Sequence, residues 1–554
     1  MIVVSSYDID RTHPVKTGGN KLKINRLLGA TALLSLGVFC YGANVPASLA
    51  ATPVDQLVLG TSLAQVLSLD PGQATEPGAA TILANAYDRL VTTDNTDATK
   101  VLPQLAASWD IEPDAVVFHL RDAKFQSGNP VTADDVVWSF SRVLQMNQAS
   151  ASVLKQFGFS TENAASLISA VDPRTVRIGL PPQATATSLL YTLTGTTGSI
   201  VDKKTALAHE TDGDHANGWL RVNSAGSGPF KLTRWSPNEM IMLERNDDYW
   251  GQKPAMRRVV MRHLPESQVQ RLQLTKGDLD VGLALSAKDI MSFEGNKEFQ
   301  IQQLPAGGFY ALAMNCQNPY LSNPDVRRAI AWAIDYDGIA KSIMGPYGRV
   351  RQMPVPINFA GALPDPGYKL DVAKAKEYLA KAGYPDGFPL VLKTIAETPR
   401  VDLATALQAS LGQVGIKVSI EQGNGSQIIA AHRGRQFDLL LPQTGNGLPT
   451  GIGALSDFAH NPDNSDKGNP GYFAWRSACD IPDINKLYEQ AMGERDDARQ
   501  VEMIKQLQQM IVDAAPAVLP MFERFTPIVV SARLQGFYGQ GFRGTRFETV
   551  TKAE

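Results

Sequence analysis

The sequence predicts an α/β protein built from more than one lobe. The chain has 554 residues, which is more than one ordinary hydrophobic core holds. Hydrophobic residues make up 44% and charged residues 19% of it, a composition that fits a globular soluble protein. Helix and strand patterns alternate through its middle, which favours α/β units. There is no internal repeat and no low-complexity linker, so the segments do not read as successive self-contained domains.

Residues 1–50 are expected to be a signal peptide. Basic residues at 21–26 precede an apolar run over 27–38, and small residues at 48–50 offer a cleavage site. The run is shorter than the roughly 20 apolar residues of a spanning helix, and no later stretch approaches that length. A retained anchor is the alternative. The bulky Phe39 before Cys40 argues against lipidation, and the long leader before Leu27 leaves a downstream start codon open.

The first half of the mature chain shows strand and helix patterns in turn. A strand at 56–60 and a helix at 78–92 come first. Alternation through Val116, Phe118 and Leu120 indicates the second of two strands. Thr132 then caps a helix whose first turn carries acids. The patterns that follow predict a hairpin from 226–235 and 240–251, a strand at 257–264, and a helix within 269–285 that ends at Gly277 and leads into a buried strand.

The second half alternates more regularly. The expected elements are strands at 309–315, 390–395, 416–421 and 437–443, helices at 324–335, 371–383 and 401–415, helical segments at 483–492 and 497–513, and terminal strands at 517–522 and 526–531. Cys316 and Cys479 are left in the mature chain, and export makes a disulfide possible. Two unpaired thiols are equally compatible with the sequence.

Several long motifs resemble the family 5 solute-binding proteins of ABC importers, the group with dipeptide, oligopeptide and nickel binders. The motif PQLAASWDIEPDAVVFHLRDAKFQSGNPVTADDVVWSFSR at 103–142 follows the family pattern almost continuously. SGPFKLTRW, LERNDDYWG, TKGDLDVG, MNCQNPYLSNPDVRRAIAWAID and KAKEYLAKAGYPDGFPL match later family motifs in the same order. The resemblance runs from about Leu57 to about Phe537.

The resemblance implies a two-lobed, class II-like periplasmic binding protein with an inserted subdomain and crossing strands as a hinge. By this analogy lobe I combines 51–95, 206–300 and 515–554. The inserted subdomain covers 96–205, and lobe II covers 301–514. Aromatic residues in the matched motifs, such as Trp109, Phe118, Trp138 and Trp250, are expected to belong to the framework.

The sequence offers no constellation for catalysis, a metal or a cofactor. Its seven histidines form no HExxH motif, and there is no GxSxG or Walker A sequence. His209 and His215 stand near Glu210 and Asp214, as in a metal site or a polar surface loop. The acidic stretch at 463–468 lacks the glutamate that an EF-hand requires at its twelfth position, so it indicates a turn. We therefore expect no enzyme, no cofactor and no metal.

A binding site is expected at LPQTGN, residues 441–446, where a buried strand ends. Ligands of open α/β sheets bind at such strand ends. In dipeptide binders the family pattern here is similar to GWTGD, whose Asp accepts the peptide ammonium. Thr444 and Gly445 match it, but Asn446 replaces the Asp and carries no charge. Arg400 falls one position from the family's carboxylate-binding arginine; an exposed helix-terminal arginine is the alternative.

Glu523 and Arg524 precede the last strand. They either face the cleft or pair with each other at the surface.

These observations predict a periplasmic receptor that binds peptides or peptide-like solutes and delivers them to ABC permease subunits in the inner membrane. The loss of the acidic residue leaves an opine-like compound, a glycoside or a metal chelate as alternative ligands. A secreted hydrolase is a remote alternative, and a chaperone or signalling receptor on the same fold is another. The formal net charge of −3 gives no electrostatic reason for nucleic-acid binding. We expect a monomer.

Overall fold

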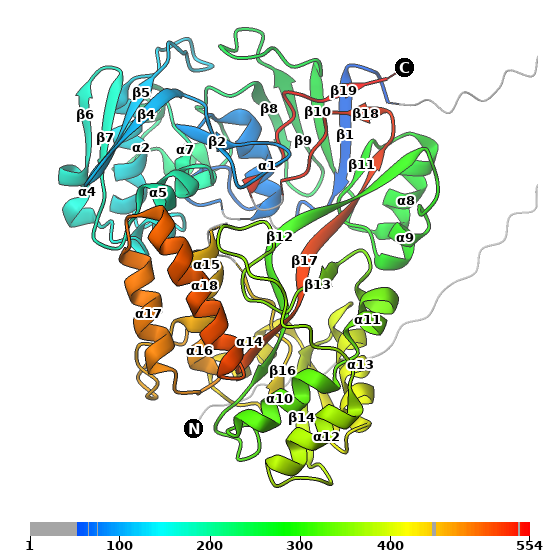
Figure 1. Ribbon diagram of the computed structural model, residues 1–554. Helices are drawn as coiled ribbons and strands as arrows, with labels where there is room; N and C mark the ends of the chain where they lie inside the picture. The colour runs from blue at the N-terminus through cyan, green and yellow to red at the C-terminus, as the bar shows by residue number, and fades with distance from the viewer. Residues whose placement is uncertain (1–51, 65, 75, 446–449, 541–542, 554) are drawn as a thin grey trace, which may run out of the picture. The chain divides into compact units, whose positions relative to one another are not determined.

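The computed structural model describes residues 52–553 except 65, 75, 446–449 and 541–542 (Figure 1). The expected signal peptide and the expected ligand residue Asn446 therefore lie outside the described residues. Within those residues, no helix has both the length and the apolar character needed to cross a membrane.

A mixed sheet of 11 strands runs through the described part of the chain, in the order β15-β14-β16-β12-β17-β11-β1-β10-β9-β8, with β13 paired to β17. The pairs of β1 with β10 and β11, and of β14 with β15 and β16, are parallel, and the other ladders are antiparallel. The strands are β1 (Gln56–Thr61), β8 (Phe230–Ser236), β9 (Met240–Arg245), β10 (Arg258–His263), β11 (Val281–Gly282), β12 (Phe299–Met314), β13 (Gly348–Val350), β14 (Pro389–Ile395), β15 (Lys417–Gly423), β16 (Leu439–Leu440) and β17 (Val518–Ser531).

Smaller sheets accompany it. A four-stranded antiparallel sheet has the order β4-β5-β7-β6, and β2–β3 and β18–β19 are two-stranded. Their strands are β2 (Val91–Thr93), β3 (Val101–Pro103), β4 (Ala106–Glu112), β5 (Ala115–Leu120), β6 (Ile168–Asp172), β7 (Thr175–Gly179), β18 (Leu534–Gln535) and β19 (Thr551–Lys552).

The helices alternate with these strands, which confirms the α/β prediction. The helices are α1 (Pro77–Ala86), α2 (Ala133–Gln145), α3 (Ala151–Lys155), α4 (Thr161–Leu167), α5 (Ala186–Leu193), η1 (Thr196–Gly198), α6 (Lys203–Leu207), α7 (Asn217–Leu220), α8 (Ser267–Lys276), α9 (Ala287–Met291), α10 (Pro324–Ala333), α11 (Tyr336–Ile339), η2 (Ala340–Met344), α12 (Val372–Lys381), α13 (Arg400–Gly412), α14 (Gly425–Arg433), α15 (Gly451–Ala459), α16 (Phe473–Arg476), α17 (Pro482–Gly493) and α18 (Asp497–Asp513).

The long strands β12 and β17 lie side by side and link the two groups of strands in the large sheet (Figure 1). They pair antiparallel from Phe299 opposite Ser531 to Ala313 opposite Val518, and the ladder is irregular between Pro305 and Phe309. The prediction of two separate terminal strands is wrong, because β17 is continuous over that stretch.

Hydrophobic cores join segments that are distant in sequence. One core combines residues of 57–87 with residues of 201–261 and 528–550. Another takes all its buried members from 90–200, around the four-stranded sheet. Two further cores draw their members from 309–522. The boundaries of the expected lobes stay a prediction.

The predicted helix at 78–92 ends early, at Ala86. Asp88 follows it, and its buried carboxylate accepts hydrogen bonds from Tyr249 Oη at 3.0 Å and Trp250 Nε1 at 2.8 Å. These contacts come from residues far along the chain and hold the backbone away from the helix. The predicted strand at 437–443 is likewise shorter, because only Leu439 and Leu440 join the ladder.

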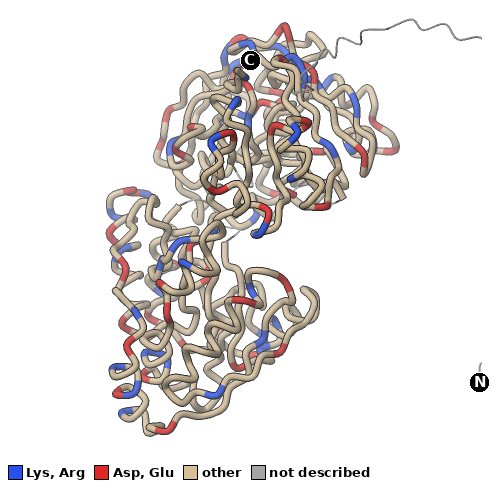
Figure 2. Tube along the Cα trace, turned by 90° about the vertical axis from the view of Figure 1, so that its right-hand side faces the viewer, with Lys and Arg blue, Asp and Glu red and all other residues tan. Residues whose placement is uncertain are grey.

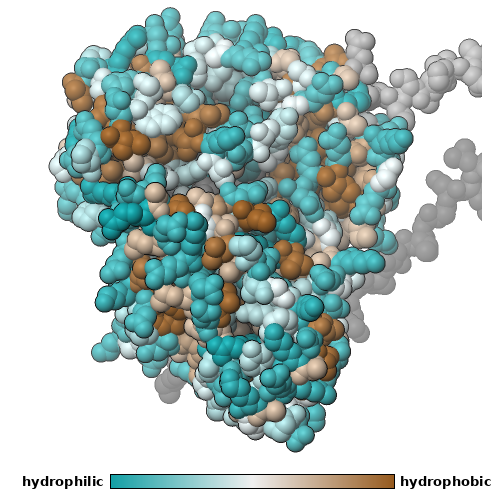
Figure 3. All heavy atoms as spheres, viewed as in Figure 1, coloured by the Kyte–Doolittle hydropathy of each residue, from teal (hydrophilic) through white to brown (hydrophobic). Residues whose placement is uncertain are grey.

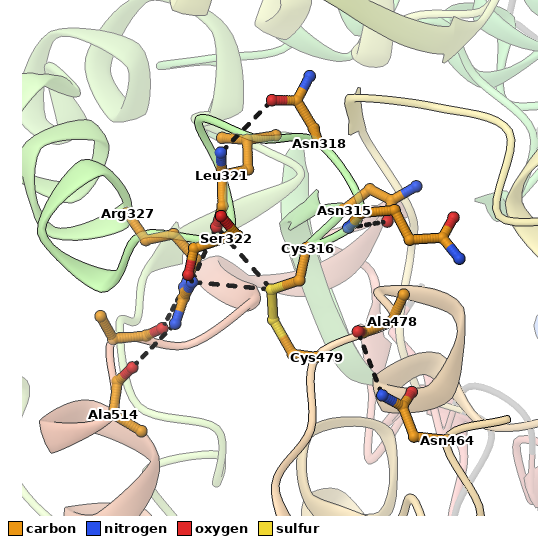
Figure 4. Close-up of a disulfide and its surroundings, with 12 residues drawn as sticks. Asn315, Cys316, Asn318, Leu321, Ser322, Arg327, Asn464, Ala478, Cys479 and Ala514 are labelled. Atoms are coloured by element: carbon orange, nitrogen blue, oxygen red, sulfur yellow. Dashed lines mark hydrogen bonds between the residues drawn. A yellow bond between two sulfur atoms is a disulfide. The ribbon is translucent and has the colours of Figure 1, made fainter. Parts of the chain in front are cut away.

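Cys316 and Cys479 form a disulfide, with their Cα atoms 5.1 Å apart (Figure 4). The bond ties the segment after β12 to the segment before α17 and closes a loop of 163 residues. Arg327 Nη1 lies 3.7 Å from Cys316 Sγ and also donates to backbone carbonyls. The sequence was compatible either with a disulfide or with two free thiols, and the structure contains the disulfide.

The disulfide is expected to contribute measurably to stability. Replacing both cysteines with serine should lower the free energy of unfolding by about 2–4 kcal/mol, since the open loop gains conformational entropy in the unfolded chain. Urea unfolding of the double variant against the oxidised wild type measures this difference. A change below about 0.5 kcal/mol would contradict the expectation.

Candidate functional site

Thr444 and Gly445 lie against β12. The backbone N–H of Thr444 donates to Phe309 O at 2.9 Å, and the N–H of Phe309 donates to Thr444 Oγ1 at 3.0 Å. Thr444 is only 1% exposed. Its hydroxyl therefore fixes the segment to the strand.

Gly445 is required by the close approach of the two backbones. Its φ is +89°, and a Cβ there would lie 2.2 Å from Gly307 O and 2.5 Å from Gly308 Cα. Only glycine accommodates both constraints. The irregularity of the β12–β17 ladder between Pro305 and Phe309 coincides with this contact.

The peptide unit between Thr444 and Gly445 connects two charged side chains. Its carbonyl oxygen, Thr444 O, accepts from Arg524 Nη1 at 3.1 Å. Its N–H, on Gly445, donates to Asp457 Oδ2 at 3.0 Å. Arg524 comes from β17 and Asp457 from α15, so the short segment joins strands and helix at one point.

Arg524, Arg400 and Tyr310 interact at this point. The guanidinium of Arg524 lies 5.8 Å from the Tyr310 ring centroid. Burial lowers the pKa of Arg524, and repulsion by Arg400 adds to the effect while Tyr310 opposes it. Burial raises the pKa of Tyr310, against the attraction of both arginines. The phenol of Tyr310 therefore interacts with two cations, Arg400 and Arg524.

Arg400 is the first residue of α13 and only 9% exposed, so the exposed alternative for this residue is wrong. Its Nε lies 3.1 Å from Glu397 Oε1. Burial lowers the pKa of Arg400, and Glu397 opposes the shift. A partly desolvated guanidinium with one carboxylate beside it suits an anionic group of a ligand.

A cavity of about 280 Å³ adjoins Gly445 and Arg524. Arg524 is the one charged residue among the described residues that line it. Apolar side chains make up half of the lining residues, and four threonine hydroxyls add polar groups; the apolar ones are Leu59, Met261, Leu283, Leu304, Ala306, Ile528 and Phe537. An apolar cavity with a convergent cation fits the common form of small-molecule sites.

Glu523 and Arg524 do not pair with each other. Glu523 is buried and accepts from Arg349 Nε at 2.9 Å and Nη2 at 2.8 Å. Arg524 points to Thr444 and Tyr310 instead. Sequence reasoning named Arg524 as a cleft candidate but missed Tyr310 and Asp457, for which no motif gave a signal.

The acidic loop at 209–215 forms contacts within itself. His215 Nδ1 lies 3.4 Å from Glu210 Oε1, and Asp214 accepts from the backbone N–H groups of Thr211 and Gly218. Among the residues that the structure describes, no three or more His, Cys, Asp or Glu side chains group as metal ligands do. These contacts are those of a polar surface loop.

The surface carries both charge signs. Basic and acidic residues are interspersed along the trace (Figure 2). The face shown in Figure 3 is mostly hydrophilic, with scattered apolar residues. This mixture agrees with the small net charge and gives no basis for a large single-signed interface.

Comparison with known proteins finds a close family relation. The model for bacterial extracellular solute-binding proteins, family 5 middle, matches residues 100–466. The probable D,D-dipeptide-binding periplasmic protein DdpA of Escherichia coli K12 is 30% identical over 502 residues, which cover 89% of this chain and 93% of that protein.

Solved structures agree with this relation. The periplasmic binding protein DppA of Helicobacter pylori, in complex with the peptide STSA, has a TM-score of 0.70 at 25% identity and covers 90% of this chain and 98% of its own. MoaA of A. tumefaciens R10, in complex with mannopinic acid, has a TM-score of 0.69 at 25% identity. The match covers 91% of this chain and 100% of MoaA.

Proposed function

Because this chain belongs to the family 5 bacterial extracellular solute-binding proteins, we propose that it is the periplasmic receptor of an ABC importer for peptides or peptide-like solutes. The observation that carries the proposal is the cavity beside Gly445, with Arg524 and the nearby Arg400 available to an anionic group. The receptor binds its ligand and delivers it to permease subunits without a chemical step. Residues 1–50 serve as the signal peptide that directs export, and the mature protein acts as a monomer.

The binding residues proposed are Arg400, Thr444, Gly445 and Asn446, to which the geometry adds Arg524. Thr444 and Gly445 act through their backbone, since the hydroxyl of Thr444 is bonded to Phe309. The lobes follow the sequence-based boundaries, with β12 and β17 as the crossing strands. Ligand binding then occurs where these strands pass the 444–445 segment.

The ligand class follows from the relatives and the cavity together. DdpA is named for D,D-dipeptides and the H. pylori protein holds a peptide, which supports a peptide ligand here. The A. tumefaciens protein holds mannopinic acid, and Arg524 at this cavity suits that carboxylated compound as well. An opine-like ligand is therefore the second candidate.

Calorimetric titration of the purified protein tests the proposal. We expect saturable binding of D-alanyl-D-alanine or L-alanyl-L-alanine, with mannopinic acid titrated in parallel for the second candidate. Arg524→Gln should weaken binding by about 10- to 100-fold, since a charge-assisted hydrogen bond is lost. Arg234→Gln, an exposed arginine on β8 paired with Glu239, serves as the control and should bind as wild type does. Binding of neither dipeptide would contradict the peptide proposal.

A further inference from the structure

Two parts of the fold meet with little packing between them. One part, residues 96–205, surrounds the four-stranded sheet and is called the insert here; the other is the helical layer of α15, α17 and α18. The core around the four-stranded sheet takes its buried members from 90–200, and the core beneath the helical layer takes its own from 309–518. A cavity of about 290 Å³ lies between the two parts, lined from within 156–188 and 452–500. The insert and the helical layer thus keep separate cores.

Polar contacts beside this cavity connect the insert to the helical layer. The guanidinium of Arg495, in the turn between α17 and α18, donates to Pro113 O and, at 3.3 Å, to Leu180 O. Thr187 Oγ1 on α5 donates to Asp497 Oδ1 at 3.0 Å, and Asp497 is the first residue of α18. We call these contacts of Arg495 and Asp497 the latch.

The two carbonyls that Arg495 contacts are held in place by the four-stranded sheet. Pro113 lies in the turn between β4 and β5, and Leu180 directly follows β7, which pairs with β5. The N–H of Leu180 donates to Asp114 O at 2.7 Å and fixes the two turns against each other. A guanidinium offers several donors in one plane, so a single arginine can bind both carbonyls. The latch therefore has a prepared acceptor surface on the insert.

The insert is attached more firmly to the part of the molecule that contains β1 and β8–β10. Arg142 on α2 forms an ion pair with Asp70 at 2.6 Å, and both side chains are at most 2% exposed. Gln126 Nε2 donates to the carbonyls of Gly228 and Phe230, at 3.1 and 2.8 Å. Buried contacts of this kind hold segments together, whereas small polar interfaces within a chain commonly allow relative motion. We therefore expect the insert to stay with β1 and β8–β10 and to separate from α17 and α18.

We propose that Arg495 and the Thr187–Asp497 pair are positioning residues that stabilise the closed receptor without touching the ligand. Among the described residues that line the cavity at Arg524, none belongs to the latch. The inference rests on the proposed function, because it concerns closure of the same receptor, and it assigns the insert a role that ligand contact does not require. Bending of β12 and β17 opens the latch together with the ligand site. The measured affinity then includes the closing equilibrium, which the latch shifts toward the closed form.

Calorimetric titration of Arg495→Gln is the first test. The variant should bind each of L-alanyl-L-alanine, D-alanyl-D-alanine and mannopinic acid that the wild type binds more weakly, by one common factor of about 5- to 30-fold. The factor is common because the change acts on closure and not on any ligand. Ligand release should be faster and association unchanged. Arg499→Gln is the matched control, since Arg499 is an exposed arginine on α18 that pairs with Glu494 at 3.3 Å, and it should bind as wild type does.

A double-mutant cycle tests the second contact of the latch. Thr187→Val and Asp497→Ala should each weaken binding by about 3- to 10-fold, because each removes the same hydrogen bond from the closed form. The double variant should then bind no more weakly than either single variant. Additive losses would contradict the proposal, because they would show that the two side chains do not interact in the bound receptor.

Small-angle X-ray scattering of the ligand-free protein tests the latch without any ligand. The protein is unfolded and refolded with its disulfide intact, so that a co-purified compound is removed. Because the latch involves no ligand atom, the wild type should populate the closed form by itself. Arg495→Gln combined with Thr187→Val should shift the radius of gyration upward, and Arg499→Gln should leave it unchanged.

Two outcomes overturn the inference while the proposed function stands. One is a radius of gyration that is the same in wild type and in the combined variant. The other is a loss of affinity in Arg495→Gln that differs between compounds, which would mean that Arg495 acts on the ligand. If the wild type binds none of the three compounds, the peptide proposal fails, and the scattering measurement still decides whether the latch exists.

Discussion

Arg142→Met is expected to lower the free energy of unfolding by about 3–5 kcal/mol. Arg142 on α2 donates to both carboxylate oxygens of Asp70, at 2.9 and 2.6 Å, and both side chains are at most 2% exposed. Gln148 and Asn217 also donate to this carboxylate, at 3.0 and 2.6 Å. Removal of the cation leaves a buried charge with only neutral donors. Urea unfolding at pH 7 measures the effect.

The pair of Lys203 with Asp134 provides the control, because both side chains are solvent-exposed. Lys203→Met should change the free energy of unfolding by no more than about 1 kcal/mol. The double variant Asp70→Asn/Arg142→Met should be more stable than Arg142→Met alone, since no unpaired charge remains. A loss below 1 kcal/mol in Arg142→Met would show that the buried pair is not a main support of this core.

Gly445→Ala is expected to abolish most ligand binding, with affinity reduced by about 100-fold or more. The new Cβ would lie 2.2 Å from Gly307 O at a φ of +89°, so the segment must move away from β12. That movement breaks the hydrogen bonds of the 444–445 peptide unit to Arg524 and Asp457. Titration with the dipeptide that wild type binds best measures the loss.

Gly412→Ala is the matched control for this variant. Gly412 ends α13, and a Cβ there meets no atom within 4 Å. It should bind ligand as wild type does and gain up to about 1 kcal/mol of stability, because alanine is the better helix residue. Binding by Gly445→Ala within threefold of wild type would mean that the 444–445 segment is not part of the site.

Local signals account for the elements that the sequence predicted well. Helix α8 ends at Lys276 and is capped by Gly277, whose φ of +79° is the left-handed conformation that glycine favours. Thr132 is the N-cap residue of α2, and the Asp135 carboxylate accepts from its N–H at 2.9 Å. In contrast, the end of α1 depends on Tyr249 and Trp250, which bond to Asp88 from distant segments. The periodicity of apolar residues along the sequence does not predict such long-range contacts.

The candidate site was also predictable only in part, because some of its contacts join segments that are distant in sequence. The order of motifs located Thr444 and Gly445, and the strand pattern brought Arg524 into consideration. Tyr310 lies near Arg524 only because β12 pairs with β17, and sequence patterns do not determine that pairing. Asp457 bonds to the backbone N–H of Gly445, and a contact with a backbone group leaves no residue pattern in the sequence. Nothing in the sequence distinguishes it from the other acids.

The most direct test of the account is recovery of a bound dipeptide. The protein is saturated with isotopically labelled D-alanyl-D-alanine or L-alanyl-L-alanine, washed, and unfolded, and the released compound is identified by mass spectrometry. The account predicts one dipeptide per chain, released intact after prolonged incubation. Release of free alanine, or no retained compound from any peptide or mannopinic acid, would contradict it.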